Sequence, residues 1–243
     1  MNQRKPMLIG TGIAVAVVIV IGLVLAIVLL PSGSADQTAS PSTTPTAEQT
    51  TPTEQTSPES TVHATTFARN LPDDPMAIGD IDAPVLMIEW ADLRCHYCGV
   101  FANETLPGLI SEYVDAGLLR IEWHSAVVLG DTSADAAVAA RAAGQQDLFW
   151  EYIEAIYATE PTGQTVWDRD ALVGIAESIP GMDVAQFTAD LDDPELIAAA
   201  QAETQQSIDS GITGTPMFVV GSEVLQGAQP LENFAAVIDA QLG

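Results

Sequence analysis

The two cysteines of the chain, Cys95 and Cys98, lie three positions apart, directly after a short apolar run at 85–90. Two cysteines are too few for an all-cysteine zinc site or for the disulfide framework of a small secreted protein. Segment 99–117 carries apolar residues at helical spacing and ends at a glycine, and 118–129 is again apolar and β-prone. The order strand, CxxC turn, helix, strand predicts a βαβ unit.

This arrangement places the two thiols at the start of a helix, where a reactive thiolate would be stabilised. The start of a helix favours a thiolate, because its N–H groups are unpaired and the helix dipole is positive there. We therefore expect Cys95 to be the exposed, ionised nucleophile, and Cys98, one turn later, to close a small disulfide with it. A protonated His96 beside the sulfur would lower the pKa of Cys95 further and favour the reduced form.

The rest of the folded part contains a long helical insertion. Segment 131–210 is rich in alanine and is punctuated by glycines, which predicts four or five helices. Segment 214–227 then predicts two short strands around Gly221, and a final helix follows at 230–242. Three helix starts are expected within the insertion, at Thr132, Asp168 and the pair Asp193–Pro194. An aromatic run is interpreted as the packed face of one of these helices: Phe149, Trp150, Tyr152 and Tyr157.

The N-terminal part predicts export and anchoring. Residues 7–30 carry no charge and are long enough to cross a bilayer as a helix. Arg4 and Lys5 predict that the tail at 1–6 stays cytoplasmic and that the rest is exported. The alternative is a cleaved signal peptide with a small-residue site at 33–35, although the apolar run is longer than is usual for one.

Residues 31–66 read as a disordered tether. They are rich in Pro, Ser and Thr and nearly lack apolar residues, so they cannot bury enough surface to offset the entropy of ordering. The folded domain is expected at 67–243. Acidic residues outnumber basic ones by 33 to 7, which makes nucleic acid an improbable partner.

The segment MIEWADLRCHYCGVF resembles the active-site segment of the thioredoxin superfamily, and 74–243 is similar to its DsbA-like branch. The resemblance implies an α/β thioredoxin fold with an inserted helical subdomain. Glu89 stands six residues before Cys95, where the superfamily keeps a buried acid that carries a proton to or from the second cysteine. The resemblance also covers Gly214-Thr215-Pro216, which matches the loop whose cis-proline packs beside the disulfide.

These correspondences imply roles for single residues. A cis Pro216 would hold the Thr215 backbone open, so that an extended client peptide could pair with it. No organic cofactor is implied. The dipeptide His96-Tyr97 is neither the Gly-Pro of thioredoxins nor the Pro-His of DsbA, which leaves the redox potential open.

Other interpretations of the same residues stay open. Cys95, Cys98, His63 and His124 could in principle bind zinc. Glu89 could face solvent instead of the core, and His124 is expected to be structural rather than catalytic.

The sequence thus predicts a membrane-anchored, extracytoplasmic thiol-disulfide oxidoreductase that introduces disulfides into exported proteins. Its expected partners are reduced client proteins and a quinone-linked membrane oxidase that reoxidises it. Two alternatives are kept: a reductase or isomerase on the same fold, and a tethered binding module that does no chemistry.

Overall fold

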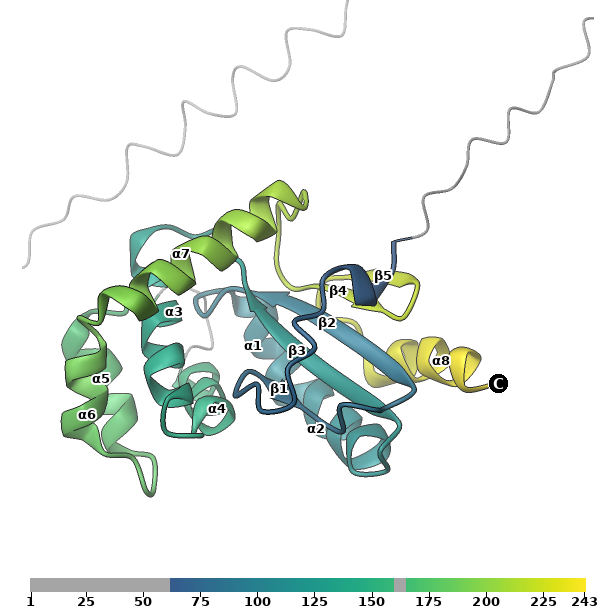
Figure 1. The fold of residues 1–243 in the computed structure, drawn as a ribbon, viewed down its shortest axis with the longest axis horizontal. Helices are drawn as coiled ribbons and strands as arrows, with labels where there is room; N and C mark the ends of the chain where they lie inside the picture. Colours follow the sequence, from purple (N-terminus) through teal and green to yellow (C-terminus); the bar gives the residue numbers. More distant parts are fainter. Residues whose placement is uncertain (1–61, 160–164) are drawn as a thin grey trace, which may run out of the picture. The chain divides into compact units, whose positions relative to one another are not determined.

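A five-stranded sheet in the order β1-β3-β2-β4-β5 forms the centre of the computed structural model, which describes residues 62–159 and 165–243 (Figure 1). The central strands β2 and β3 run parallel, and every other neighbouring pair is antiparallel. The strands are β1 (Ala77–Ile78), β2 (Val85–Ala91), β3 (Leu119–Ser125), β4 (Met217–Val220) and β5 (Glu223–Gln226).

The connection between the parallel strands β2 and β3 is helical from His96 to Val114, so the predicted βαβ unit is confirmed. It ends at Gly117, whose φ of +70° closes the helical segment as expected. Two π-helical turns interrupt the α-helix, one of them directly before the turn that contains Pro107, a residue with no N–H to donate. The pieces are α1 (His96–Val100), η2 (Phe101–Thr105), α2 (Leu106–Leu109) and η3 (Ile110–Val114).

Strand β3 is shorter than predicted. It ends at Ser125, whereas the apolar run continues to Leu129. The backbone N–H groups of Val128 and Leu129 donate to the carboxylate of Asp92, at 2.9 and 3.0 Å, instead of to a neighbouring strand. A side chain from the end of β2 therefore ends the sheet here.

The helical insertion is confirmed, and its described residues, which leave out 160–164, form five helices (Figure 1). Asp168 and Asp193 cap their helices by accepting backbone N–H groups, as predicted. The first helix begins at Asp131 rather than Thr132, because Gly130, with φ of +95°, takes the N-cap position. The helices are α3 (Asp131–Gly144), α4 (Phe149–Thr159), α5 (Arg169–Glu177), α6 (Val184–Asp190) and α7 (Pro194–Asp209); α8 (Leu231–Leu242) closes the chain as predicted.

Residues before Phe67, the expected start of the domain, already pack against the fold. Ala64 is buried, and its N–H donates to the carbonyl of Gly221 at 2.7 Å, next to the turn between β4 and β5. The predicted transmembrane segment at 7–30 and the tether up to residue 61 lie outside the described residues. Within the ranges that the structure describes, no helix is both long enough and apolar enough to cross a membrane.

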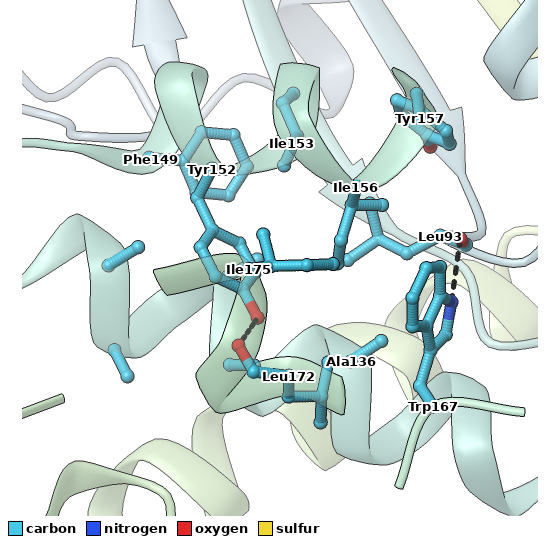
Figure 2. Close-up of a cluster of buried hydrophobic side chains, with 14 of the residues drawn as sticks. Leu93, Ala136, Phe149, Tyr152, Ile153, Ile156, Tyr157, Trp167, Leu172 and Ile175 are labelled. Carbon is cyan, nitrogen blue, oxygen red and sulfur yellow. Dashed lines mark hydrogen bonds between the residues drawn. The ribbon is translucent and has the colours of Figure 1, made fainter. Parts of the chain in front are cut away.

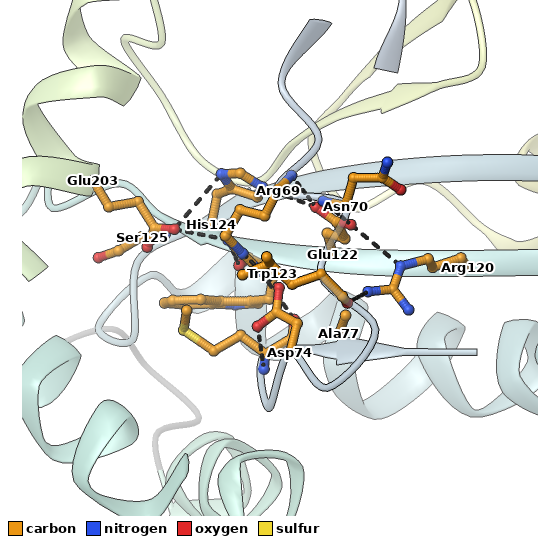
Figure 3. A network of polar contacts seen from close by, with 12 residues as sticks. Arg69, Asn70, Asp74, Ala77, Arg120, Glu122, Trp123, His124, Ser125 and Glu203 are labelled. Atoms are coloured by element: carbon orange, nitrogen blue, oxygen red, sulfur yellow. Dashed lines mark hydrogen bonds and ion pairs between the residues drawn. The ribbon is translucent and has the colours of Figure 1, made fainter. Parts of the chain in front are cut away.

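Buried charges join β3 to α7 (Figure 3). The carboxylate of Glu203 accepts hydrogen bonds from Arg69 and from the N–H of Ser125, both at 2.8 Å, and from Arg141. A buried carboxylate needs such partners to offset its loss of hydration. This network therefore docks the insertion against the end of β3.

His124 lies inside the same network. Its two ring nitrogens are 3.8 Å from Glu122 and 3.7 Å from Glu203. Burial alone would raise the pKa of Glu122, but the nearby His124 ring and hydrogen bonds from the Arg69 backbone and Arg120 lower it to about 2. His124 thus lies between two carboxylates of this network, and its structural role stays a prediction. In the described part of the chain, no group of three or more His, Cys, Asp or Glu side chains is arranged to hold a metal ion.

Candidate active site

The turn after β2 places the two cysteines at the start of a helix. Asp92 Oδ1 accepts the N–H of Arg94 at 2.8 Å, and the Cys95 N–H donates to the Asp92 carbonyl at 2.9 Å. These bonds turn the chain out of the strand. Cys95 is the N-cap residue of α1, and Cys98 lies in the first turn of that helix.

The two thiols differ in access. Both are free in this structure. Cys95 is 8% exposed, whereas Cys98 is 0% exposed. The expectation of an exposed nucleophile is therefore corrected: Cys95 is buried except for this small fraction, because it packs in a buried cluster and against the carbonyl of Thr215. An incoming sulfur can reach only the first cysteine.

The Cys95 thiolate is strongly stabilised. A hydrogen bond from Cys98 is the largest cause, and it outweighs burial, which acts in the opposite direction. The side chain of Thr215 and the backbone N–H groups of Cys98 and Tyr97 add to it, so that the pKa of Cys95 falls to about 6. At neutral pH this thiol is mostly ionised and leaves readily from a disulfide.

Cys98 has the opposite character. Burial, its hydrogen bond to Cys95, and the negative charges of Cys95 and Glu89 raise its pKa well above the usual value. The proton is therefore held on Cys98. The pair combines an ionised outer sulfur with a protonated inner one.

Glu89 lies in β2, where Trp123 and Phe218 are its neighbours on the adjacent strands. The residue is 2% exposed, and burial raises the pKa of its carboxyl to about 8. The structure thus places Glu89 in the core, as the resemblance implied, rather than facing solvent. A carboxyl group with this pKa can give or take a proton near neutral pH.

The loop before β4, which contains Thr215 and Pro216, contacts Cys95. The Thr215–Pro216 peptide bond is cis, as expected. The Cys95 thiol donates to the carbonyl oxygen of Thr215 at 3.3 Å. That carbonyl was expected to be open to a client peptide, but here the thiol occupies it. The contact belongs to the protonated thiol of the reduced protein, because in the disulfide form Cys95 has no proton to donate to the Thr215 carbonyl.

His96 and Tyr97 separate the cysteines and are both exposed. Their rings lie 5.3 Å apart. His96 is not among the groups that lower the pKa of Cys95. Its expected electrostatic role therefore has no contact to support it in this structure.

Sequence reasoning missed two residues that hold the site together. The Asp92 carboxylate binds the turn on one side and the loop after β3 on the other. Arg94 donates to the carbonyl of Leu129 at 2.7 Å and to that of Thr165 at 2.8 Å. The sequence carried a usable signal for both residues, because they lie three positions and one position before Cys95. A polar residue at the end of a buried strand often organises the following turn.

Tyr157 was assigned to the packed face of a helix, and this is correct (Figure 2). Its hydroxyl also donates to the Asp92 carbonyl at 3.3 Å. Burial and the nearby charges of Cys98 and Glu89 raise its pKa well above the usual value, so it stays protonated. Trp167 supports the same turn by donating to the Leu93 carbonyl at 3.1 Å (Figure 2).

Comparison with known proteins agrees with this geometry. The model of the family described as "Thioredoxin" matches residues 72–240. The chain belongs to this thioredoxin family. The "Probable disulfide bond formation protein D" of Bacillus anthracis is 27% identical over 171 residues, which cover 68% of this chain and 77% of that protein.

Two further matches show which other proteins this thioredoxin-family chain resembles. The structure of alpha-DsbA1 from Wolbachia pipientis has a TM-score of 0.63 at 22% identity, covering 74% of this chain and 96% of the other, and thus shares its fold. The resemblance to the DsbA-like branch is confirmed. The Na(+)/H(+) antiporter NhaA of Herminiimonas arsenicoxydans is 30% identical over 162 residues. That match covers 67% of this chain but only 25% of the antiporter, so the chain spans about a quarter of that relative.

Proposed function

We propose that the protein is a membrane-anchored, extracytoplasmic oxidoreductase that introduces disulfides into exported proteins. The broad class, a DsbA-like protein disulfide oxidoreductase, is supported by the similarity to a disulfide bond formation protein and to a DsbA structure. The observation that carries the proposal is the asymmetry of the thiols: Cys95 keeps a small exposed fraction and has a pKa of about 6, and Cys98 is fully buried with a raised pKa.

In the proposed reaction a client thiolate attacks Cys95 in the Cys95–Cys98 disulfide. The S–S bond breaks, a client–Cys95 disulfide forms, and Cys98 leaves as a thiolate that takes a proton, with Glu89 as the donor. A second client thiolate then attacks the client sulfur, and Cys95 leaves as a stabilised thiolate. Two client thiols have lost two electrons, and the enzyme pair has gained them.

The lowered pKa of Cys95 also sets the direction of the reaction. A stabilised thiolate favours the reduced form of the enzyme, and an enzyme that prefers to be reduced is an oxidant for its clients. This observation favours an oxidase over the reductase or isomerase alternative. An oxidase should be found mainly oxidised in the cell, whereas a reductase should be found mainly reduced.

The cellular setting is proposed from the sequence. The proposed segments are a cytoplasmic tail at 1–6, an anchor at 7–30, a tether from residue 31, and the catalytic domain, which includes Ala64 as well as the predicted 67–243. His96, Thr215 and Pro216 are proposed to act beside the cysteines. Reoxidation requires a partner that accepts two electrons, and we propose a quinone-linked membrane oxidase. The reaction itself needs no organic cofactor.

The test is refolding of a reduced, unfolded disulfide-containing protein by the oxidised enzyme. Wild type should restore the client's disulfides and activity with loss of its own disulfide, and Cys95→Ala should not. If Cys95→Ala is as active as wild type, the protein is a binding module rather than an oxidoreductase.

A further inference from the structure

Tyr157 is a buried titratable side chain that the proposed reaction does not use. It lies in α4 of the helical insertion and belongs to the same buried cluster as Cys95 and Cys98. Burial and the charges of Cys98 and Glu89 are the largest causes that raise its pKa well above the usual value. The hydroxyl therefore stays protonated and can donate a hydrogen bond throughout the reaction.

Tyr157 is bonded to the active-site segment at two points. Its hydroxyl donates to the Asp92 carbonyl at 3.3 Å, and the same carbonyl accepts the N–H of Cys95 at 2.9 Å. The backbone carbonyl of Tyr157 accepts the side-chain amide of Asn103 at 3.3 Å. That amide also donates to the carbonyl of Gly99 at 2.8 Å. One residue of the insertion thus contacts both the turn before Cys95 and the helix after Cys98.

The backbone of Asp92 connects this contact to the inner sulfur. It makes a hydrogen bond to Cys98 that lowers the pKa of this thiol, whereas burial and the negative charges of Cys95 and Glu89 raise that pKa. A backbone N–H that donates to a sulfur stabilises its thiolate form. The orientation of the Asp92 backbone therefore determines how well a Cys98 thiolate is stabilised.

A second buried tyrosine of α4 provides a comparison. Tyr152 is fully buried in the same cluster, and its hydroxyl donates to the carbonyl of Leu172 at 3.1 Å (Figure 2). Leu172 lies in α5, within the insertion. Burial raises the pKa of Tyr152 as well, but no charge of the active site contributes to this rise. The two tyrosines are thus alike in burial and differ in the backbone segment that each hydroxyl holds.

We propose that Tyr157 is a positioning residue for the leaving thiolate: its hydroxyl fixes the Asp92 backbone so that the Asp92 N–H donates to Cys98 when Cys98 leaves. The inference rests on the proposed function, in which a thiolate attacks Cys95 of the disulfide. In that step the Cys95–Cys98 bond breaks, a bond from the attacking sulfur to Cys95 forms, and the electron pair of the broken bond stays on Cys98. Tyr157 itself is not changed chemically.

The reverse step uses the same inner sulfur. In a mixed disulfide at Cys95, the Cys98 thiolate attacks Cys95 and expels the bound thiolate. Loss of the Tyr157 hydroxyl should make the Cys98 thiolate less stable. If its thiolate fraction falls tenfold while its nucleophilicity rises about threefold, the attack slows by roughly three- to fourfold. Departure of Cys98 in the forward step should slow as well, because a thiol of higher pKa leaves less readily.

The experiment compares full-length wild type, Tyr157→Phe and the matched control Tyr152→Phe, with glutathione as the attacking thiol. Each substitution removes one buried hydroxyl and keeps the ring. Acid quenching and mass spectrometry follow two rates: formation of the Cys95–glutathione disulfide from the oxidised enzyme, and its resolution by Cys98. The resolution rate is measured from pH 6 to 9, and thiolate ultraviolet absorbance gives the pKa of Cys95 in the reduced enzyme.

Tyr157→Phe should slow both steps by about three- to fourfold or more and move the pH profile of resolution to higher pH. The pKa of Cys95 should stay near 6, because Tyr157 and Asp92 are not among the groups that lower it. Tyr152→Phe should match wild type in both rates, which separates a positioning role from a loss of core stability.

The proposal is overturned if Tyr157→Phe keeps both wild-type rates, or if Tyr152→Phe slows them equally. It is also overturned if Tyr157→Phe raises the pKa of Cys95, because the hydroxyl would then support the whole turn rather than the inner sulfur. Failure of the proposed function would look different: wild type would exchange with glutathione but would not restore the disulfides of an unfolded client.

Discussion

The Cys95 thiol lies 3.3 Å from the backbone carbonyl of Thr215, a residue 120 positions later in the chain. The side chain of Thr215 also binds the sulfur and lowers its pKa. One residue of the late loop therefore serves both to hold the nucleophile and to stabilise its charge.

Thr215→Val should raise the pKa of Cys95 from about 6, by about one unit, because the substitution removes a hydrogen bond to the thiolate. The reduction potential should become more negative by about 30 mV, since the reduced form loses that stabilisation. Thiolate ultraviolet absorbance against pH gives the first quantity, and equilibration with glutathione gives the second. Thr215→Ser keeps the hydroxyl and should match wild type. If the Thr215→Val variant and wild type gave equal titration curves, Thr215 would not be stabilising the Cys95 thiolate.

Glu89→Gln should change how stability depends on pH. The folded-state pKa of Glu89 is raised to about 8, so its stability contribution is present below the unfolded pKa of 4.5 and is lost as the pH rises through 8. Relative to wild type, Glu89→Gln should gain about 1.4 kcal/mol per pH unit between pH 4.5 and 8, and no more above that. Denaturant unfolding of the reduced proteins across this range measures the difference. A difference that does not vary with pH would mean that Glu89 is not titrating in the core.

Glu203→Gln should lower the free energy of unfolding by about 3–5 kcal/mol, because it leaves the buried charge of Arg141 without a carboxylate and leaves Arg69 with Asp74 alone. Asp192→Asn is the control, since it removes an exposed carboxylate from an ion pair with Arg169. The control should unfold at nearly the wild-type denaturant midpoint. Similar losses in the two variants would contradict the assignment of Glu203 as the buried anchor of the insertion.

His96→Ala should leave the pKa of Cys95 near 6, because the stabilising groups are Cys98, Thr215 and backbone N–H groups. The same thiolate titration measures this. A clear rise in the pKa would restore the electrostatic role that the sequence suggested for His96, and would show that its ring approaches the sulfur in solution.

The arrangement of elements was predictable because it follows from local patterns. The buried run before the cysteines, the N-caps Asp168 and Asp193, and the paired strands around Gly221 each carry their own signal in a few residues. The short strand β1 was not predicted, since two residues are too few to show a period. Strand β3 was predicted too long, because its end is set by Asp92, a contact distant in sequence.

The principal residues of the candidate site could be predicted from the sequence, whereas the contacts that support them could not. Spacing and resemblance were enough to find Cys95, Cys98, Glu89 and the Thr215–Pro216 loop. The supporting contacts of Arg94 run to backbone carbonyls of two distant loops. A backbone carbonyl has no residue identity, so no sequence pattern marks it as a partner.

The central claim is that Cys95 is the sulfur that clients attack and Cys98 is the one that leaves. Trapping tests it most directly: a Cys98→Ala variant and a Cys95→Ala variant are each activated as mixed disulfides with a small thiol, and their exchange with a cysteine-containing client peptide is followed by mass spectrometry. The account predicts rapid transfer of the peptide to Cys95 in the Cys98→Ala variant and slow or no transfer to Cys98 in the other. Equal transfer in the two variants, or faster transfer to Cys98, would contradict it.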